Sequence, residues 1–130
     1  MVPRRLSILL VTDDDGEEVR RSLERIASKD SVHVVHTPQA ALELLRTERI
    51  PSTRRLVLVD LPAPLELVRS LRADVVLRKT PVIVLAREDR PAEAAHQLHV
   101  AGYVKKPSDA AALTEALRTI HQYWSSMELV

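Results

Sequence analysis

The sequence predicts a doubly wound α/β domain, a three-layer sandwich with five parallel strands in the order 2-1-3-4-5 between two layers of helices. Two observations support this prediction. Short apolar runs alternate with longer amphipathic stretches along the whole chain, which is typical of βαβ units. The chain has 130 residues, enough for a hydrophobic core, so we expect residues 1–130 to form one domain.

Each predicted strand is a short run dominated by Val, Ile and Leu. Such runs are expected in parallel sheets, whose strands are buried on both faces. In chain order the runs are residues 8–11, 32–35, 56–59, 82–85 and 102–105. The last is the weakest signal, since it holds only Tyr103 and Val104 as apolar residues.

Apolar residues at helical spacing predict a helix after every strand. The first is expected over about residues 17–28, and the third ends near Ala73. Pro38 and Pro91 open the second and fourth, because proline is tolerated in a first turn. Ser108 is the expected N-cap of the last helix. The apolar faces are Val19, Leu23 and Ile26; Ala41, Leu42 and Leu45; Leu65, Val68 and Leu71; Ala94, Ala95 and Leu98; and Leu113, Leu117, Ile120 and Tyr123.

The composition excludes several classes of function. The net charge is +1, which gives no electrostatic basis for binding nucleic acid or an anionic membrane. Cysteine is absent, so disulfide and thiolate chemistry are excluded. No apolar run approaches the roughly 20 residues of a membrane span, and the first run is too short for a signal peptide. We therefore expect a cytoplasmic protein that contacts neither nucleic acid nor membrane.

Acidic residues and one lysine follow three of the predicted strands. Asp13 and Asp14 come after the first strand, Asp60 ends the third, and Lys106 follows the fifth. The carboxyl ends of parallel strands meet at one edge of the sheet, where such folds build their sites. These groups predict a pocket for a divalent cation and a phosphoryl group. Taken alone, the acids after the first strand could equally be a solvated helix N-terminus.

Four motifs in order resemble the receiver domain of bacterial two-component response regulators. They are residues 9–14 (LLVTDD), 58–61 (LVDL), 81–85 (PVIVL) and 103–107 (YVKKP). The resemblance covers nearly the whole chain and implies a flavodoxin-like fold. Residues 98–100 (LHV), with Tyr103, Lys106, Tyr123 and Trp124, further resemble the small single-domain regulators that partner bacterial and cyanobacterial phytochrome kinases.

The resemblance implies roles for the site residues. Asp60 would be the phosphoacceptor, and Lys106 would contact the phosphoryl group as a point charge. Mg²⁺ would be the cofactor, because it is a hard ion that prefers oxygen ligands. Its ligands would come from Asp13 or Asp14, from Asp60 and from the backbone carbonyl of Pro62. The resemblance also implies a cis peptide bond before Pro107.

Three features depart from the family pattern. Thr12 stands at the first acidic position if the strand is aligned without a gap, so the acid pair is either Thr12 with Asp13 or Asp13 with Asp14. Ala86 stands at the Thr or Ser switch position, and alanine cannot donate the hydrogen bond that would couple a phosphoryl group to the aromatic switch residue Tyr103. The loop after Asp60 is about four residues short and lacks glycine.

These observations leave two main hypotheses. The first is a non-enzymatic, stand-alone receiver that accepts a phosphoryl group on Asp60 from a sensor histidine kinase, with a bacteriophytochrome as a candidate kinase. The second is a degenerate pseudo-receiver that binds proteins without phosphorylation. An unrelated flavodoxin-like enzyme or nucleotide binder is disfavoured, because neither glycine lies in a phosphate-binding loop. We also expect a homodimer through the fourth helix, fifth strand and last helix, with Tyr123, Trp124 and residues 127–130 at the contact.

Overall fold

The expected sheet is present. The computed structural model describes residues 6–14, 16–26, 31–47, 55–86 and 97–126. Within them, five parallel strands form one sheet in the predicted order β2-β1-β3-β4-β5. The strands are β1 (Ser7–Thr12), β2 (Ser31–Val35), β3 (Arg55–Asp60), β4 (Val82–Ala86) and β5 (Gly102–Lys105). The fold is therefore the predicted flavodoxin-like α/β architecture.

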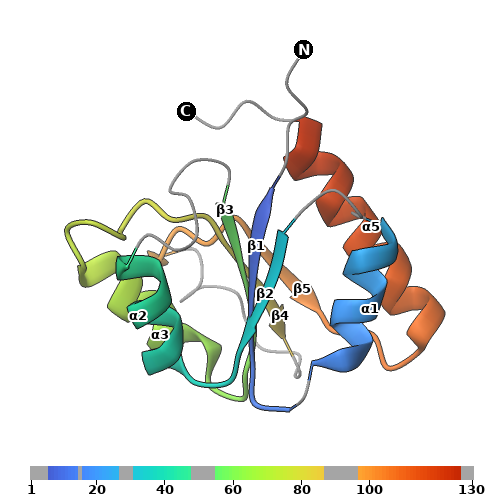
Figure 1. Ribbon diagram of the computed structural model, residues 1–130, viewed down its shortest axis with the longest axis horizontal. Coiled ribbons are helices and arrows are strands. Elements are labelled where there is room, and N and C mark those ends of the chain that lie inside the picture. Colours follow the sequence, from blue (N-terminus) through green and yellow to red (C-terminus); the bar gives the residue numbers. More distant parts are fainter. Residues whose placement is uncertain (1–5, 15, 27–30, 48–54, 87–96, 127–130) are drawn as a thin grey trace.

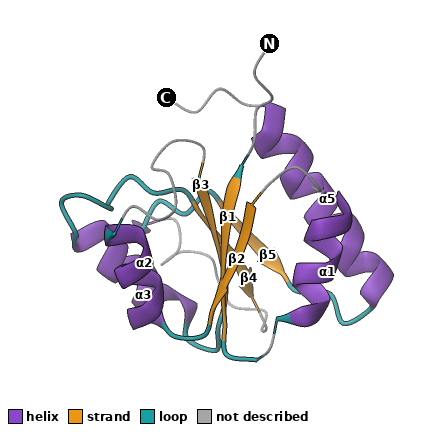
Figure 2. Ribbon diagram, in the orientation of Figure 1, coloured by secondary structure: helices purple, strands orange, loops and turns teal. Residues whose placement is uncertain are grey.

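Helices cover both faces of the sheet. They are α1 (Glu17–Ile26), α2 (Pro38–Arg46), α3 (Pro64–Ala73) and α5 (Ala110–Ser126). Figure 1 shows α1 and α5 together on one face and α2 and α3 on the other, and Figure 2 shows the loops that join them to the central strands. The helix predicted to open at Pro91 falls in residues 87–96, which lie outside the described residues.

Alternating strand residues divide the core between the two faces. Leu9 and Val11 of β1 belong to the cluster on the α2 and α3 side, whereas Ile8 and Leu10 belong to the cluster on the α1 and α5 side. This alternation follows from the two-residue period of a strand. Because both faces are covered, β1, β3 and β4 are buried along almost their whole length.

Helix starts follow the capping chemistry of the sequence, with one difference from the prediction. The Thr37 hydroxyl accepts a hydrogen bond from the Ala40 amide and caps α2, with Pro38 next in the chain. For α5 the predicted cap at Ser108 is wrong. Helix α5 begins at Ala110, and an Asp109 carboxylate oxygen accepts from the Ala111 amide at 3.3 Å. Aspartate is as good an N-cap as serine, and it lies one residue closer to the apolar face.

The turn between α3 and β4 is held by a carboxylate. One oxygen of Asp74 accepts from the amides of Val76 (2.8 Å) and Leu77 (3.2 Å), and the other lies 3.0 Å from an Arg46 guanidinium nitrogen. The hydrogen bond from the Val76 amide, helped by Arg46, holds the pKa of Asp74 below its usual value. The turn is thus fixed best when Asp74 is ionised.

The guanidinium of Arg72 joins the end of α3 to two other segments. It donates to the carbonyl oxygens of Leu98 (2.8 Å), Arg78 (3.0 Å), Thr80 (2.8 Å) and His99 (3.1 Å). Partial burial lowers the pKa of this group. Arg72 therefore ties the entry to β4 to the turn that precedes β5.

None of the helices in the described part of the chain is long and apolar enough to cross a bilayer.

Candidate phosphoacceptor site

Asp60 is at the carboxyl end of the central strand β3 and is enclosed on all sides. Its side chain is only 1% exposed. In the parallel register between β1 and β3, Thr12 is the residue level with Asp60. The sheet order places β1 on one side of Asp60 and β4 on the other. The carboxylate is thus positioned by three neighbouring strand ends, as the sequence predicted.

Lys106 is the cation of this site. Its Nζ lies 2.8 Å from Asp60 Oδ2, and its side chain is 23% exposed. The lysine is held at the end of β5 because its backbone amide donates to the Ala86 carbonyl oxygen at 2.7 Å. An ion pair this short is a charge-assisted hydrogen bond, which is stronger than a neutral one. The predicted convergence of Asp60 and Lys106 is therefore present.

The hydroxyl of Thr12 lies between two carboxylates. Its Oγ1 donates to Asp14 Oδ1 at 2.9 Å and lies 3.5 Å from Asp60 Oδ2. Thr12 is fully buried, whereas Asp13 and Asp14 are exposed. In the register of the sheet, Thr12 therefore stands where β1 meets Asp60, and the two acids follow it.

The loop from β1 to α1 is shaped by these same groups. The Gly16 amide donates to Asp14 Oδ1 at 2.7 Å, so this oxygen accepts two hydrogen bonds. Gly16 has a φ of 68°, which other residues rarely adopt. A ring nitrogen of His36, just beyond β2, is 3.1 Å from the Thr12 carbonyl oxygen. His36 is not among the residues predicted at the site, although its position directly after a predicted strand was a signal for it.

Ala86 and Tyr103 occupy the β4 and β5 side of the site. Ala86 is the last residue of β4 and is buried. Tyr103 pairs with Val84 in the sheet and packs, half-buried, against the core cluster on the α2 and α3 side. Ala86 brings a methyl group to this side of Asp60 and no hydrogen-bond donor beyond its backbone. The connection from β3 to α3 is as short as expected, only residues 61–63.

The carboxylates supply the oxygen donors that Mg²⁺ prefers, but within the described residues they do not form a metal-binding group of three. Among the described residues, no group of three or more acidic, histidine or cysteine side chains is arranged to hold a metal ion. Asp60 Oδ2 already faces Lys106, and Pro62 is exposed. The residues therefore match the ion in chemistry and do not match it in arrangement.

The cis peptide bond expected before Pro107 is absent. The described residues contain no cis peptide bond, so Lys106 and Pro107 are joined in trans. The trans isomer is intrinsically favoured even before proline, by roughly 0.5–1 kcal/mol. The hydrogen bond from the Lys106 amide to Ala86 positions the lysine in the trans chain.

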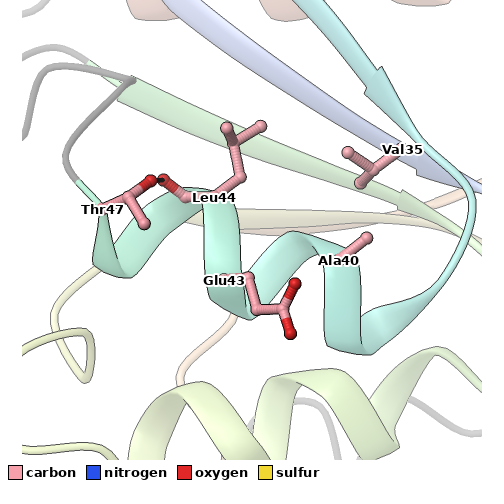
Figure 3. A pocket seen from close by; sticks show the side chains of 5 residues that line it. All are labelled: Val35, Ala40, Glu43, Leu44 and Thr47. Carbon is pink, nitrogen blue, oxygen red and sulfur yellow. Dashed lines mark hydrogen bonds between the residues drawn. The ribbon is translucent and has the colours of Figure 1, made fainter.

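A separate hollow lies beside α2 and does not belong to this site. It is lined by Val35, Ala40, Glu43, Leu44 and Thr47, and Figure 3 shows the Thr47 hydroxyl bonded to the Leu44 carbonyl oxygen at its rim. Of its lining residues in the described part of the chain, Glu43 is the charged one. Neither Asp60 nor Lys106 contributes to it, so we assign it no part in the chemistry at Asp60.

The aromatic pair near the C-terminus has two different environments. Trp124 is 9% exposed and packs in the core cluster with Leu113 and Leu117. Tyr123 is 56% exposed and meets the Trp124 ring edge-on, with centroids 5.5 Å apart. Trp124 is covered within its own chain, so of the pair only Tyr123 is open to a second copy. Residues 127–130 of the predicted contact lie outside the described residues.

Several solved structures with the same fold are response regulators. The phosphorylated cyanobacterial phytochrome response regulator RcpA is 26% identical, with a TM-score of 0.80 over 94% of this chain and 95% of that one. A response regulator receiver domain from Rhodospirillum rubrum is 21% identical, with a TM-score of 0.79 over 95% and 96%. The Mn²⁺-bound response regulator Rcp1 is 20% identical, with a TM-score of 0.75 over 95% and 98%. No protein-family model and no curated protein matches the sequence.

Proposed function

We propose that this chain, which has the fold of the response regulator receiver domains, accepts a phosphoryl group on Asp60 and signals through contacts with other proteins. The observation that carries the proposal is the 2.8 Å pair of Asp60 and Lys106 at the carboxyl edge of the sheet. A carboxylate nucleophile beside a fixed cation is what transfer to an aspartate requires.

The proposed donor is a phosphohistidine on a sensor kinase. A carboxylate oxygen of Asp60 attacks the phosphorus, the P–N bond breaks, and its electron pair goes to the imidazole nitrogen. The product is an acyl phosphate, whose added negative charge Lys106 offsets. Because Asp60 is only 1% exposed, the donor reaches it only after a rearrangement, and the part-exposed Lys106 side chain is the group best able to move.

Mg²⁺ is the proposed cofactor on the chemistry of the carboxylates alone. When bound, it would neutralise phosphoryl charge, with Asp13 or Asp14, Asp60 and the Pro62 carbonyl oxygen as its proposed ligands. Since the described residues form no metal-binding group of three, no step of the transfer is assigned to the ion.

The proposed partner is a histidine kinase, with phytochromes the leading class. Phytochrome response regulators are among the structures that share this fold. The chain would act in the cytoplasm, as a signalling module and not as an enzyme that turns over a small molecule. A homodimer through β5, α5 and the segment before β5 is also proposed, with Tyr123 as the exposed aromatic residue on α5.

A pseudo-receiver is the second candidate, and three observations favour it. Ala86 lacks a hydroxyl, the Asp60 carboxylate is enclosed, and the described acids form no metal-binding group. In this reading the Asp60 and Lys106 pair is a structural ion pair, and partner proteins bind the chain regardless of phosphorylation.

Intact mass after incubation with Mg²⁺ and acetyl phosphate separates the two candidates. We expect the wild type to gain one phosphoryl mass and Asp60→Asn to gain none. Asp109→Asn is the matched control, because asparagine caps a helix as well as aspartate does, so this variant should gain the same mass as wild type. An unmodified wild type, under conditions that label another receiver, would reject phosphoryl acceptance in favour of the pseudo-receiver.

A further inference from the structure

Within the described part of the chain, a hydroxyl from β1 comes within hydrogen-bond distance of Asp60. Thr12 Oγ1 is 3.5 Å from Asp60 Oδ2 and 2.9 Å from Asp14 Oδ1. A hydroxyl carries a single proton, so it can donate fully to one carboxylate at a time. The shorter distance shows that the proton is directed to Asp14. Thr12 is thus a donor with a second acceptor within reach.

On the opposite side of Asp60, the last described residue of β4 is Ala86, which carries no hydroxyl. The sheet order puts β3 between β1 and β4, and β4 ends in the buried methyl group of Ala86. The two strand ends that flank Asp60 are therefore chemically unequal. A hydroxyl stands on the β1 side, and an apolar group stands on the β4 side, toward Tyr103.

Thr12 is also connected to the loops on its own side. Its acceptor Asp14 Oδ1 also accepts from the Gly16 amide at 2.7 Å, directly before α1. Its carbonyl oxygen is 3.1 Å from the ring of His36, which lies two residues before the start of α2. A change in the Thr12 hydrogen bond would therefore first alter the hydrogen bonding of Asp14 and Gly16.

We infer that Thr12 is the hydroxyl that responds to a phosphoryl group on Asp60, and that it directs the response to the loop between β1 and α1. This inference rests on the proposed phosphorylation. A phosphoryl group adds about two negative charges and three strong acceptor oxygens. Charged acceptors form the stronger hydrogen bonds. The Thr12 proton turns from Asp14 to the phosphoryl group, Asp14 Oδ1 loses the Thr12 donor, and the Gly16 amide that shares this oxygen changes its environment.

The chain carries a built-in reporter for each side of the site. It has only two glycines, Gly16 and Gly102. Gly16 lies in the β1 to α1 loop, and Gly102 opens β5 next to Tyr103. Full-length protein labelled with ¹⁵N-glycine gives two amide signals. Gly102→Ala assigns them, because a Cβ at position 102 meets Ile83 at an ordinary 3.4 Å.

The experiment compares these two signals before and after acetyl phosphate is added, with Mg²⁺ present in both samples because Asp14 is a proposed Mg²⁺ ligand and accepts from the Gly16 amide, and intact mass is measured on the same samples. We expect the Gly16 amide to shift more than the Gly102 amide in wild type. In Thr12→Val, which keeps the shape and removes the hydroxyl, the Gly16 shift should be largely lost at equal mass gain. In Thr12→Ser, which keeps the hydroxyl, it should persist.

Comparing Thr12→Val with wild type at equal mass gain separates the hydroxyl from the field of the added charge, because both proteins carry the same phosphoryl group. A Gly16 shift that persists in Thr12→Val, or a wild-type response larger at Gly102 than at Gly16, overturns the inference and leaves the proposed function standing. Absence of mass gain in wild type overturns both. If Thr12→Val does not fold, Thr12→Ala, which also removes the hydroxyl, takes its place in the comparison with wild type and Thr12→Ser.

Discussion

Removing Lys106 should cost much more stability than neutralising Asp60, although the two form one ion pair. The Asp60 side chain is 1% exposed and the Lys106 side chain 23% exposed. In Lys106→Met the Asp60 carboxylate loses the charge of Lys106 and, at 1% exposure, cannot replace it with water. In Asp60→Asn the lysine can turn its ammonium group to solvent on a flexible stem.

The magnitudes follow from these exposures. Breaking a buried pair by removing one partner costs about 3–5 kcal/mol. The partial exposure of Lys106 and the Thr12 hydroxyl near Asp60 Oδ2 lower this, so we expect about 2–4 kcal/mol for Lys106→Met. At roughly 4 °C per kcal/mol for a domain of this size, the thermal unfolding midpoint of Lys106→Met should fall by about 8–16 °C. Asp60→Asn should cost about 1 kcal/mol or less.

Urea unfolding of wild type, both single variants and the double variant completes a double-mutant cycle. The double variant should have a free energy of unfolding close to that of Asp60→Asn, which gives a coupling free energy between the two residues of at least about 1.5 kcal/mol. The slope of the free energy of unfolding against urea concentration should be the same in all four proteins. Lys79→Met, which removes an exposed lysine before β4, should lie within about 0.5 kcal/mol of wild type. Equal costs for Lys106→Met and Asp60→Asn, or a larger cost for Asp60→Asn, would refute the reasoning.

Three further expectations concern packing, hydrogen bonding and pH. Trp124→Ala should lose about 3–5 kcal/mol of unfolding free energy, whereas Tyr123→Ala, at an exposed position, should lose under about 1 kcal/mol. A Trp124→Ala loss that grows with protein concentration would instead place Trp124 between copies. Arg72→Ala should lose about 2–3 kcal/mol of unfolding free energy, measured with urea. Arg69→Ala, at an exposed position, should lose under about 0.5 kcal/mol. Similar losses in the two variants would contradict the bridging role of Arg72. The pKa of Asp74 is lowered, so its carboxylate contributes fully to the free energy of unfolding above the ordinary pKa of about 3.9 and loses this contribution as pH falls through the lowered pKa. The free energy of unfolding of Asp74→Asn should therefore depend less steeply on pH below pH ~4 than that of wild type. An unchanged pH dependence would argue against this stabilising role of the carboxylate.

The sequence predicts the sheet well because strand signals here are local. Val, Ile and Leu runs mark the five strands, and the residue directly after a run is at the sheet edge, which is why Asp60 and Lys106 could be paired in advance. Helix ends are less predictable, because Ser108 and Asp109 are adjacent and equally able to cap. The role of Thr12 was the hardest to foresee. Whether a threonine at a strand end contacts Asp14, Asp60 or neither depends on distances of a few tenths of an ångström, which the sequence alone does not define.

The positive φ at Gly16 has a consequence for how this chain can diverge. A Cβ at position 16 would lie 2.9 Å from the Cγ2 methyl of Thr12, which is closer than real Cβ contacts come. The change Thr12→Ser would keep the hydroxyl and remove that methyl group. Asparagine tolerates a φ of this sign better than other residues with a side chain. We therefore expect positions 12 and 16 to covary among descendants of this sequence, with Gly16→Asn accepted together with Thr12→Ser and selected against while Thr12 is kept.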